Sequence, residues 1–194
     1  MSTFSTWPGL AFVPWLVFGV IWGVGALSTK RTVQREGPRQ MLTYRPPLTL
    51  GCILLFTPWG TRTLPALAHA FWPADATSGL VGLALSCAGI GFAIWARVHL
   101  GKYWSGAITL KEGHKLITSG PYGLARHPIY TGITLSALGS AIAIGDVSAF
   151  IGFSLIVGAF VWKLMHEERL MAQTFGEEHA QYRARVKRLV PGVW

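Results

Sequence analysis

The chain has little charge, few acidic residues and almost no cysteine. Charged residues make up 13% of its 194 residues, and 8 Asp and Glu stand against 17 Lys and Arg. With 51% hydrophobic residues, this composition excludes an ordinary soluble domain of the same size. Cys52 and Cys87 lie in apolar runs without CxxC spacing, which excludes a disulfide framework or a cysteine zinc site. We interpret them as small core residues.

The sequence is rich in long uncharged runs. A helix that crosses about 30 Å of hydrocarbon needs about 20 mostly apolar residues. Five runs approach this length: 1–29, 46–61, 76–96, 128–145 and 147–162. We therefore predict an all-α integral membrane protein with about five transmembrane helices and a single membrane domain over 1–194. Residues 1–96 would hold three spans, and residues 97–194 a cytoplasmic loop, a helical hairpin and a C-terminal helical segment.

The ends of three runs carry further expectations. The second run is short, so we expect it to continue past Arg62, whose side chain would reach the interface. No Lys or Arg precedes the first run, so we expect that run to be retained and not cleaved as a signal peptide. Little more than Gly145 and Asp146 separates the fourth and fifth runs, which predicts an antiparallel helical hairpin.

The basic residues are distributed very unevenly between the two faces that five spans define. Five lie within 30–45, five within 97–126 and six from Lys163 onward, which leaves only Arg62 on the other face. This asymmetry predicts an N-terminus outside and a C-terminus in the cytoplasm. The net charge of +9 is then explained by topology, and we expect no nucleic-acid partner. Any chemistry would belong to the cytoplasmic side.

The segment GPYGLARHPIY, residues 120–130, is the first candidate for a site. Two glycines, two prolines, two tyrosines, an arginine and a histidine fall within eleven residues. Pro128 suits the first turn of a helix, where its missing N–H costs nothing. Arg126 and His127 have two interpretations, as a basic anchor at a helix end or as the rim of a polar site. Just upstream, 107–110 and 115–117 are expected to form short extended pieces.

The C-terminal region is predicted to be helical from Lys163, to break at Gly176 and to continue as an amphipathic basic helix over 177–188. Glu167 and Glu168 adjoin the fifth run. Carboxylates in this position are costly unless they are solvated or partnered. Lys163, one helical turn before Glu167, is a candidate partner, so solvated and partnered interpretations both stay open.

Metal chemistry has little support in the sequence. The candidate histidines are His114, His127, His166 and His179, but HExxH and Glu-x-x-His patterns are missing. We therefore expect no metal. The serine-hydrolase GxSxG and the phosphate-binding GxxxxGK[ST] patterns are also missing.

The segments GHKLITSGPYGLARHPIYTG and EERLMAQTFGEEHAQYRARVKRLVPGV are similar to the isoprenylcysteine carboxyl methyltransferase family and its bacterial relatives. The resemblance covers about residues 101–193. It implies an integral membrane methyltransferase of the bacterial inner membrane that uses S-adenosylmethionine. The cofactor would be held on the cytoplasmic side by the loop before the RHP motif and by the C-terminal segment.

Carried over position by position, the resemblance implies a set of site residues. The cofactor-binding residues would be His114, Leu116, Tyr122, Arg126, His127, Pro128, Tyr130 and Glu168. The catalytic residues on the substrate side would be Glu167, Lys163 and Arg188. Two positions depart from the family: Lys163 stands where an arginine is usual, without the planar fork of a guanidinium, and His179 stands where a tyrosine is frequent.

Several functions are compatible with these residues. We expect methyl transfer to a lipophilic or lipidated acceptor that enters from the bilayer, among membrane lipids, with a prenylcysteine carboxylate as the first candidate. A phospholipid amine, a thiol or an isoprenoid hydroxyl are alternative acceptors. An NADPH-dependent membrane reductase of the sterol type, with Lys111, Lys115 and Arg126 near the cofactor phosphate, is a second class. A membrane component without catalytic activity is a third.

Overall fold

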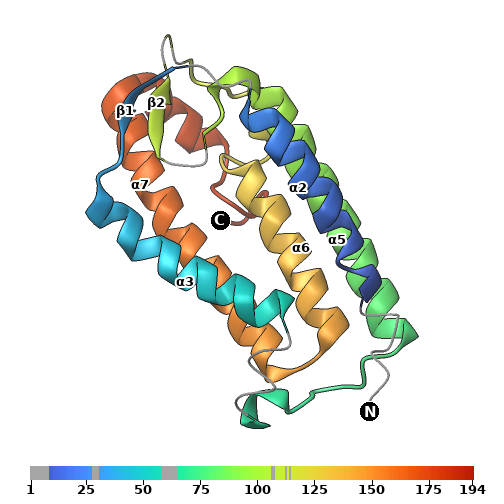
Figure 1. Cartoon of the computed structure of the whole chain (residues 1–194). Coiled ribbons are helices and arrows are strands. Elements are labelled where there is room, and N and C mark those ends of the chain that lie inside the picture. Colours follow the sequence, from blue (N-terminus) through green and yellow to red (C-terminus); the bar gives the residue numbers. More distant parts are fainter. Residues whose placement is uncertain (1–8, 28–30, 58–64, 106–107, 112, 114) are drawn as a thin grey trace.

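Helices dominate the structure of the protein, which is a computed structural model. It describes residues 9–27, 31–57, 65–105, 108–111, 113 and 115–194. For 32–35 and 109–111 it describes the backbone alone. The long helices are α2 (Val13–Ala26), α3 (Pro38–Phe56), α5 (Ala76–Leu100), α6 (Pro128–Ile144) and α7 (Val147–Arg185). Single turns of 3-10 helix cover Pro65–Ala68, Gly101–Tyr103 and Gly120–Gly123, and two strands, β1 and β2, cover Thr32–Arg35 and Thr109–Lys111. Figure 1 shows α2 lying along α5, and α3 along α7.

The predicted helical fold is confirmed, because each of the five apolar runs overlaps one of the long helices. Two helical stretches, Ala76–Tyr103 and Val147–Arg185, are long and apolar enough to cross a membrane, and α2 and α6 are shorter apolar helices. The number of five spans and their orientation stay predictions. The α2–α3 and α5–α6 connections gather at the same end of the bundle (Figure 1), as an alternating arrangement requires.

A short pair of strands accompanies the helices. β1 and β2 form an antiparallel pair in which Thr32 lies opposite Lys111 and Arg35 opposite Thr109. The sequence predicted extended pieces over 107–110 and 115–117, but residues 115–117 form no strand. The partner of β2 lies far upstream, and local alternation of residues carries no information about such a distant pairing.

The second span also differs from the prediction. α3 begins at Pro38, well before residue 46, and ends at Phe56, after which Thr57 is extended with φ −130° and ψ 145°. Thr57 is followed by a proline, and residues before proline are biased away from helical backbone. The expected continuation past Arg62 is therefore wrong for this helix, and Arg62 itself lies outside the described residues.

The turn between α6 and α7 forms the predicted hairpin. Gly145 adopts a left-handed backbone with φ 76°, which suits a residue without Cβ. The Asp146 carboxylate caps α7 by accepting a hydrogen bond from the Ala149 N–H at 2.8 Å. Because α6 and α7 run antiparallel, the first turn of α6 lies beside the middle of α7.

Small residues let α5 and α6 approach closely. A Cβ added at Gly82 would lie 2.5 Å from the carbonyl oxygen of Gly139, and one at Gly89 would overlap the carbonyl of Gly132. Between these two crossings, the Ser136 hydroxyl donates to the Ser86 carbonyl at 2.9 Å. Such small-residue contacts are a common means of helix association in membranes, and here they fix the position of α6.

The C-terminal region returns to the start of α6. Gly176 interrupts α7 with φ 48° and ψ −117°, as predicted, and the chain then bends back. The Thr131 hydroxyl of α6 donates to the carbonyl of Leu189 at 2.6 Å. The C-terminal segment is thereby attached to the first turns of α6.

We expect Gly89→Ala to lower the free energy of unfolding by about 1–3 kcal/mol, because the new methyl group would overpack the contact between α5 and α6. Gly91, on the same helix, has no atom within 4 Å of an added Cβ. Gly91→Ala is the matched control and should be neutral or slightly stabilising, because alanine favours a helix. Thermal unfolding in detergent measures both variants. Equal behaviour of the two would contradict the close approach.

Candidate functional site

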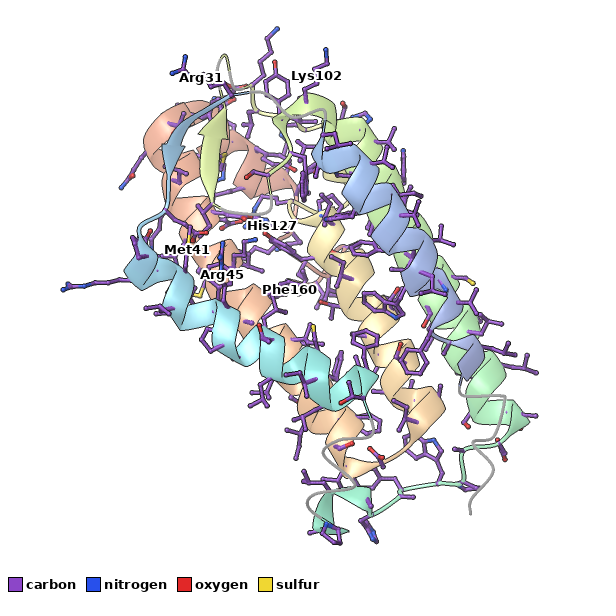
Figure 2. All side chains as sticks on the ribbon, in the orientation of Figure 1. Arg31, Met41, Arg45, Lys102, His127 and Phe160 are labelled. Carbon is purple, nitrogen blue, oxygen red and sulfur yellow. The ribbon has the colours of Figure 1, made fainter. Side chains whose placement is uncertain are left out.

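A pocket of about 280 Å³ opens beside the first turn of α6. Figure 2 places His127 inside the bundle, toward the end at which Arg31 and Lys102 lie. The pocket lining includes nine of the predicted site residues: Leu116, Tyr122, Arg126, His127, Pro128, Tyr130, Lys163, Glu167 and Glu168. Arg188 is not part of the lining but binds Glu168, and His114 lies outside the described residues.

Glu168 is the centre of the charged cluster. Its Oε1 accepts a hydrogen bond from Arg126 Nε at 2.6 Å and lies 3.3 Å from His127 Nε2. Its Oε2 pairs with Arg188 Nε at 3.1 Å and lies 4.0 Å from Arg183 Nε. The side chains of Arg126 and Glu168 are each only 7% exposed. A buried ion pair is costly unless its geometry and hydrogen bonds are good, and these partners meet that requirement.

The same cluster attaches the C-terminal segment to the loop. The Arg126 guanidinium donates through Nη1 to the carbonyl of Val186. The backbone N–H groups of Arg126 and His127 donate to the carbonyls of Lys187 and Arg188 at 2.8 and 2.9 Å. Arg188 was expected on the substrate side, but the structure places it against Glu168. The RHP segment and the C-terminal segment therefore form one wall.

His127 lies between the two carboxylates. Its Nδ1 is 3.6 Å from Glu167 Oε2, and its Nε2 is 3.3 Å from Glu168 Oε1. Burial by itself would lower the pKa of His127, but the hydrogen bonds and charges of Glu167 and Glu168 outweigh it and raise the pKa above its ordinary value. The two carboxylates therefore favour the protonated form of His127.

Glu167 has a different set of neighbours from Glu168. The Tyr130 hydroxyl donates to Glu167 Oε1 at 2.6 Å, and Lys163 Nζ lies 4.0 Å from the same oxygen. The Tyr130 ring stacks on His127 and Phe160, with centroid distances of 5.8 and 4.8 Å. Both glutamates are thus partnered, and the solvated interpretation of this pair is wrong for the structure.

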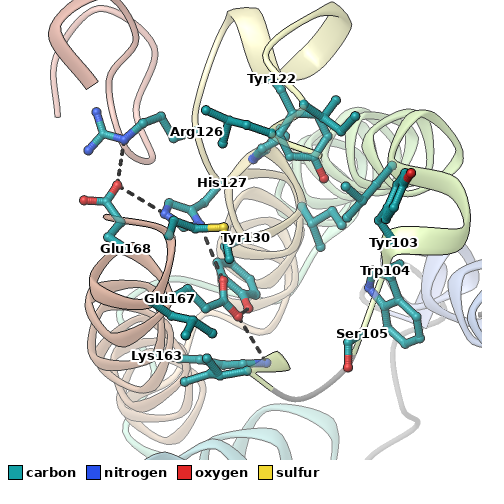
Figure 3. A pocket seen from close by; sticks show the side chains of 18 of the residues that line it. Tyr103, Trp104, Ser105, Tyr122, Arg126, His127, Tyr130, Lys163, Glu167 and Glu168 are labelled. Atoms are coloured by element: carbon teal, nitrogen blue, oxygen red, sulfur yellow. Dashed lines mark hydrogen bonds and ion pairs between the residues drawn. The ribbon is translucent and has the colours of Figure 1, made fainter. Parts of the chain in front are cut away.

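Aromatic side chains lie across the pocket from the charged ones. Figure 3 shows the charged residues on the side of α6 and α7, with Tyr103 and Trp104 opposite them. The Tyr122 ring is buried and stacks on His99, and its backbone carbonyl accepts from the Tyr182 hydroxyl at 2.6 Å. Burial raises the pKa of Tyr122, so its hydroxyl stays protonated. The pocket therefore combines charge with apolar and aromatic surface.

Sequence reasoning missed several lining residues. They are Trp22, Tyr103, Trp104, Ser105, His179 and Tyr182. Trp104 is held by Arg97, whose guanidinium lies 4.4 Å from the ring centroid and donates to the carbonyls of Gly25 and Gly101 at 2.5 and 2.9 Å. In the sequence, Arg97 contributes only to the charge asymmetry that predicts the topology. The closeness of this arginine to a tryptophan in the sequence is the one signal for their contact. The contact with Gly25 joins segments that are far apart in the sequence, so no local pattern predicts it.

Among the described residues, no group of three or more His, Cys, Asp or Glu side chains is placed to hold a metal ion.

The fold and the pocket define a helical protein whose site combines paired carboxylates and cations with aromatic walls, at the junction of α6, α7 and the C-terminal segment. Comparison with known sequences identifies its family. The chain belongs to the phospholipid methyltransferase family, whose sequence profile matches residues 77–178.

Individual relatives agree with the resemblance drawn from the sequence. The chain is 33% identical over 87 residues to protein-S-isoprenylcysteine O-methyltransferase B of Arabidopsis thaliana, covering 44% of each chain. It is 32% identical over 99 residues to the Schizosaccharomyces pombe protein-S-isoprenylcysteine O-methyltransferase, covering 50% of this chain and 42% of the relative. The cobalt-zinc-cadmium resistance protein CzcN of Cupriavidus metallidurans is 32% identical over 128 residues, covering 63% and 55%. The chain thus spans about half the length of these relatives, and the resemblance to the isoprenylcysteine methyltransferase family is confirmed.

The raised pKa of His127 leads to a pH-dependent prediction. In the unfolded chain histidine titrates near pH 6.5, whereas the folded protein holds the proton to higher pH. The stability that protonated His127 adds is therefore fully present below about pH 6.5 and is lost as pH rises through the raised folded value. Melting temperatures of the wild type and His127→Gln, measured across pH, should differ most at low pH. A difference that grows with pH would contradict this assignment.

Proposed function

We propose that the chain is an integral membrane methyltransferase that uses S-adenosylmethionine and methylates a lipophilic acceptor, with a lipidated cysteine carboxylate as the first candidate. The observation that carries the proposal is that one pocket holds both the Arg126–His127–Glu168 cluster and the adjacent Glu167–Lys163 pair. Family membership and the names of two relatives support the reaction class. The bacterial inner membrane and a cytoplasmic site are part of the proposal.

The residues present fit the proposed cofactor. S-adenosylmethionine presents a carboxylate, an ammonium, ribose hydroxyls and a purine face. The cluster around Glu168 holds more cationic than anionic groups, because Arg126, Arg188 and His127 surround one carboxylate. This excess suits the carboxylate of the ligand. The carboxylates suit the ammonium or the ribose hydroxyls.

The aromatic and apolar part of the pocket suits the purine. Tyr122 and Tyr130 offer flat faces for stacking, while Leu116 and Pro128 add apolar surface. We propose these four residues as cofactor-binding, together with Arg126, His127 and Glu168. His114, which the resemblance adds, lies outside the described residues.

When bound, S-adenosylmethionine supplies a methyl group on a positively charged sulfur, which an incoming nucleophile displaces in line. The protein has then to orient the acceptor and to exclude water. Lys163, buried in the pocket wall, is placed to bind an acceptor carboxylate. Such an acceptor is already ionised near neutral pH, so its methylation requires no general base.

A phospholipid amine is the second candidate acceptor, favoured by the name of the family. Methylation of an ammonium requires the loss of a proton. Glu167, the lining carboxylate paired with Lys163, would accept this proton. A reductase is not favoured, because two of the relatives described above are named methyltransferases. Of the three cations that would serve NADPH, Lys115 and Arg126 line the pocket, and the Lys111 side chain lies outside the described ones.

The function is tested on the purified protein in detergent. S-adenosylhomocysteine at about 100 times its dissociation constant should stabilise the protein by about 2.7 kcal/mol, seen as a higher melting temperature. Glu168→Ala should abolish this response. The matched control is Glu178→Ala, because Glu178 is exposed on the same helix and should keep it.

Transfer of a labelled methyl group to a farnesylcysteine analogue and to phosphatidylethanolamine distinguishes the two acceptors. We expect transfer to the farnesylcysteine carboxylate. Stabilisation by NADPH but not by S-adenosylhomocysteine would overturn the proposed function, and transfer to the phospholipid alone would overturn the choice of acceptor.

A further inference from the structure

The ammonium of Lys163 lies near two tyrosine rings. Its Nζ is 5.3 Å from the ring centroid of Tyr44 and 5.4 Å from that of Tyr130. Both distances fall within the range of a cation–π contact. The two rings belong to α3 and α6, while Lys163 belongs to α7. Three helices thus converge on one ammonium group.

Both tyrosines donate their hydroxyl hydrogen to a carboxylate. Tyr130 donates to Glu167 Oε1 and Tyr44 to Glu36 Oε1, each at 2.6 Å. A hydrogen bond to an anion draws the phenolic proton away and leaves more electron density on the ring, which strengthens its attraction for a cation. Both rings near the ammonium are therefore made more attractive to a cation in the same way, by a hydrogen bond from the hydroxyl to a carboxylate.

Tyr44 is held firmly although it does not line the pocket. Its side chain is 2% exposed, and its ring stacks on Trp162 with a centroid distance of 5.8 Å. Its carboxylate partner, Glu36, exchanges hydrogen bonds with Ile108: Glu36 Oε1 accepts from the Ile108 N–H at 3.2 Å, and the Glu36 N–H donates to the Ile108 carbonyl at 2.9 Å. Tyr44 thus reaches the site directly through Lys163 and indirectly through Glu36 and Ile108, which lines the pocket.

A lysine needs this support more than an arginine would. Its ammonium is a point charge on a flexible stem, without the fixed fork of a guanidinium. The two nearby rings restrict the stem and direct the charge. We propose that Tyr44 is a positioning residue that, with Tyr130, holds the Lys163 ammonium where it binds the acidic group of the methyl acceptor. The inference rests on the proposed function for the role of Lys163.

Steady-state kinetics of Tyr44 variants test the inference. Tyr44→Leu should raise KM for the farnesylcysteine carboxylate about tenfold, as expected for loss of one desolvated cation–π contact, and should leave KM for S-adenosylmethionine unchanged. Tyr44→Phe keeps the ring but loses the hydrogen bond to Glu36, so it should restore part of the affinity. The control is Thr43→Leu, because Thr43 is exposed on the same helix. An equal rise in both KM values, or failure of phenylalanine to restore affinity, would overturn the inference.

A double-mutant cycle separates positioning from a structural role. Lys163→Met keeps the stem and removes the charge. In that background Tyr44→Leu should change the acceptor KM by less than about twofold, because two residues that act through one contact are not additive. An undiminished tenfold effect in the Lys163→Met background would show that Tyr44 acts by another route.

A chemical readout keeps the inference testable if the proposed function fails. Acetic anhydride labels lysine amines according to their accessibility, and mass spectrometry of the folded protein reports the rate at Lys163. Tyr44→Leu should speed this labelling several-fold relative to Tyr44→Phe, with Lys102 as the internal reference. Absence of methyl transfer by the wild type together with faster labelling would overturn the proposed function but support the positioning. Unchanged labelling would overturn the positioning itself.

Discussion

The buried carboxylate of Glu168 connects three segments that are distant in sequence. Arg126 and His127 approach it from the loop before α6, and Arg188 approaches it from the C-terminal segment. Removing one partner from a buried ion pair leaves an uncompensated charge, which is strongly destabilising. The loop, the middle of α7 and the C-terminal segment must therefore fold together, and the pocket exists only when they do.

The packing of the helices fixes the positions of the side chains that meet at the pocket. Glycines and serines bring α5 and α6 into backbone contact, and the short hairpin at Gly145 sets α6 beside α7. These constraints place Tyr130 next to Glu167 and Lys163, and α3 adds the Tyr44 ring near the same ammonium. Substrate orientation in the proposed reaction thus depends on packing across the whole bundle.

Local patterns predicted much of the fold and part of the site. Uncharged runs indicated all five long helices, Gly145 and Gly176 marked the turn and the break, and the RHP segment with the paired glutamates indicated the polar cluster. Contacts between distant segments could not be predicted. The pairing of β1 with β2, the contact of Tyr44 with Lys163 and the support of Trp104 by Arg97 depend on tertiary packing, which leaves no periodic signal in one sequence.

In the proposed function, the RHP loop and the C-terminal segment bind S-adenosylmethionine together. Hydrogen–deuterium exchange of the purified protein, with and without S-adenosylhomocysteine, tests this joint binding. We expect slower exchange in both 120–127 and 186–191 at the same ligand concentration, because their backbones are hydrogen-bonded to each other. Protection of neither segment, or of only one of them, would contradict it.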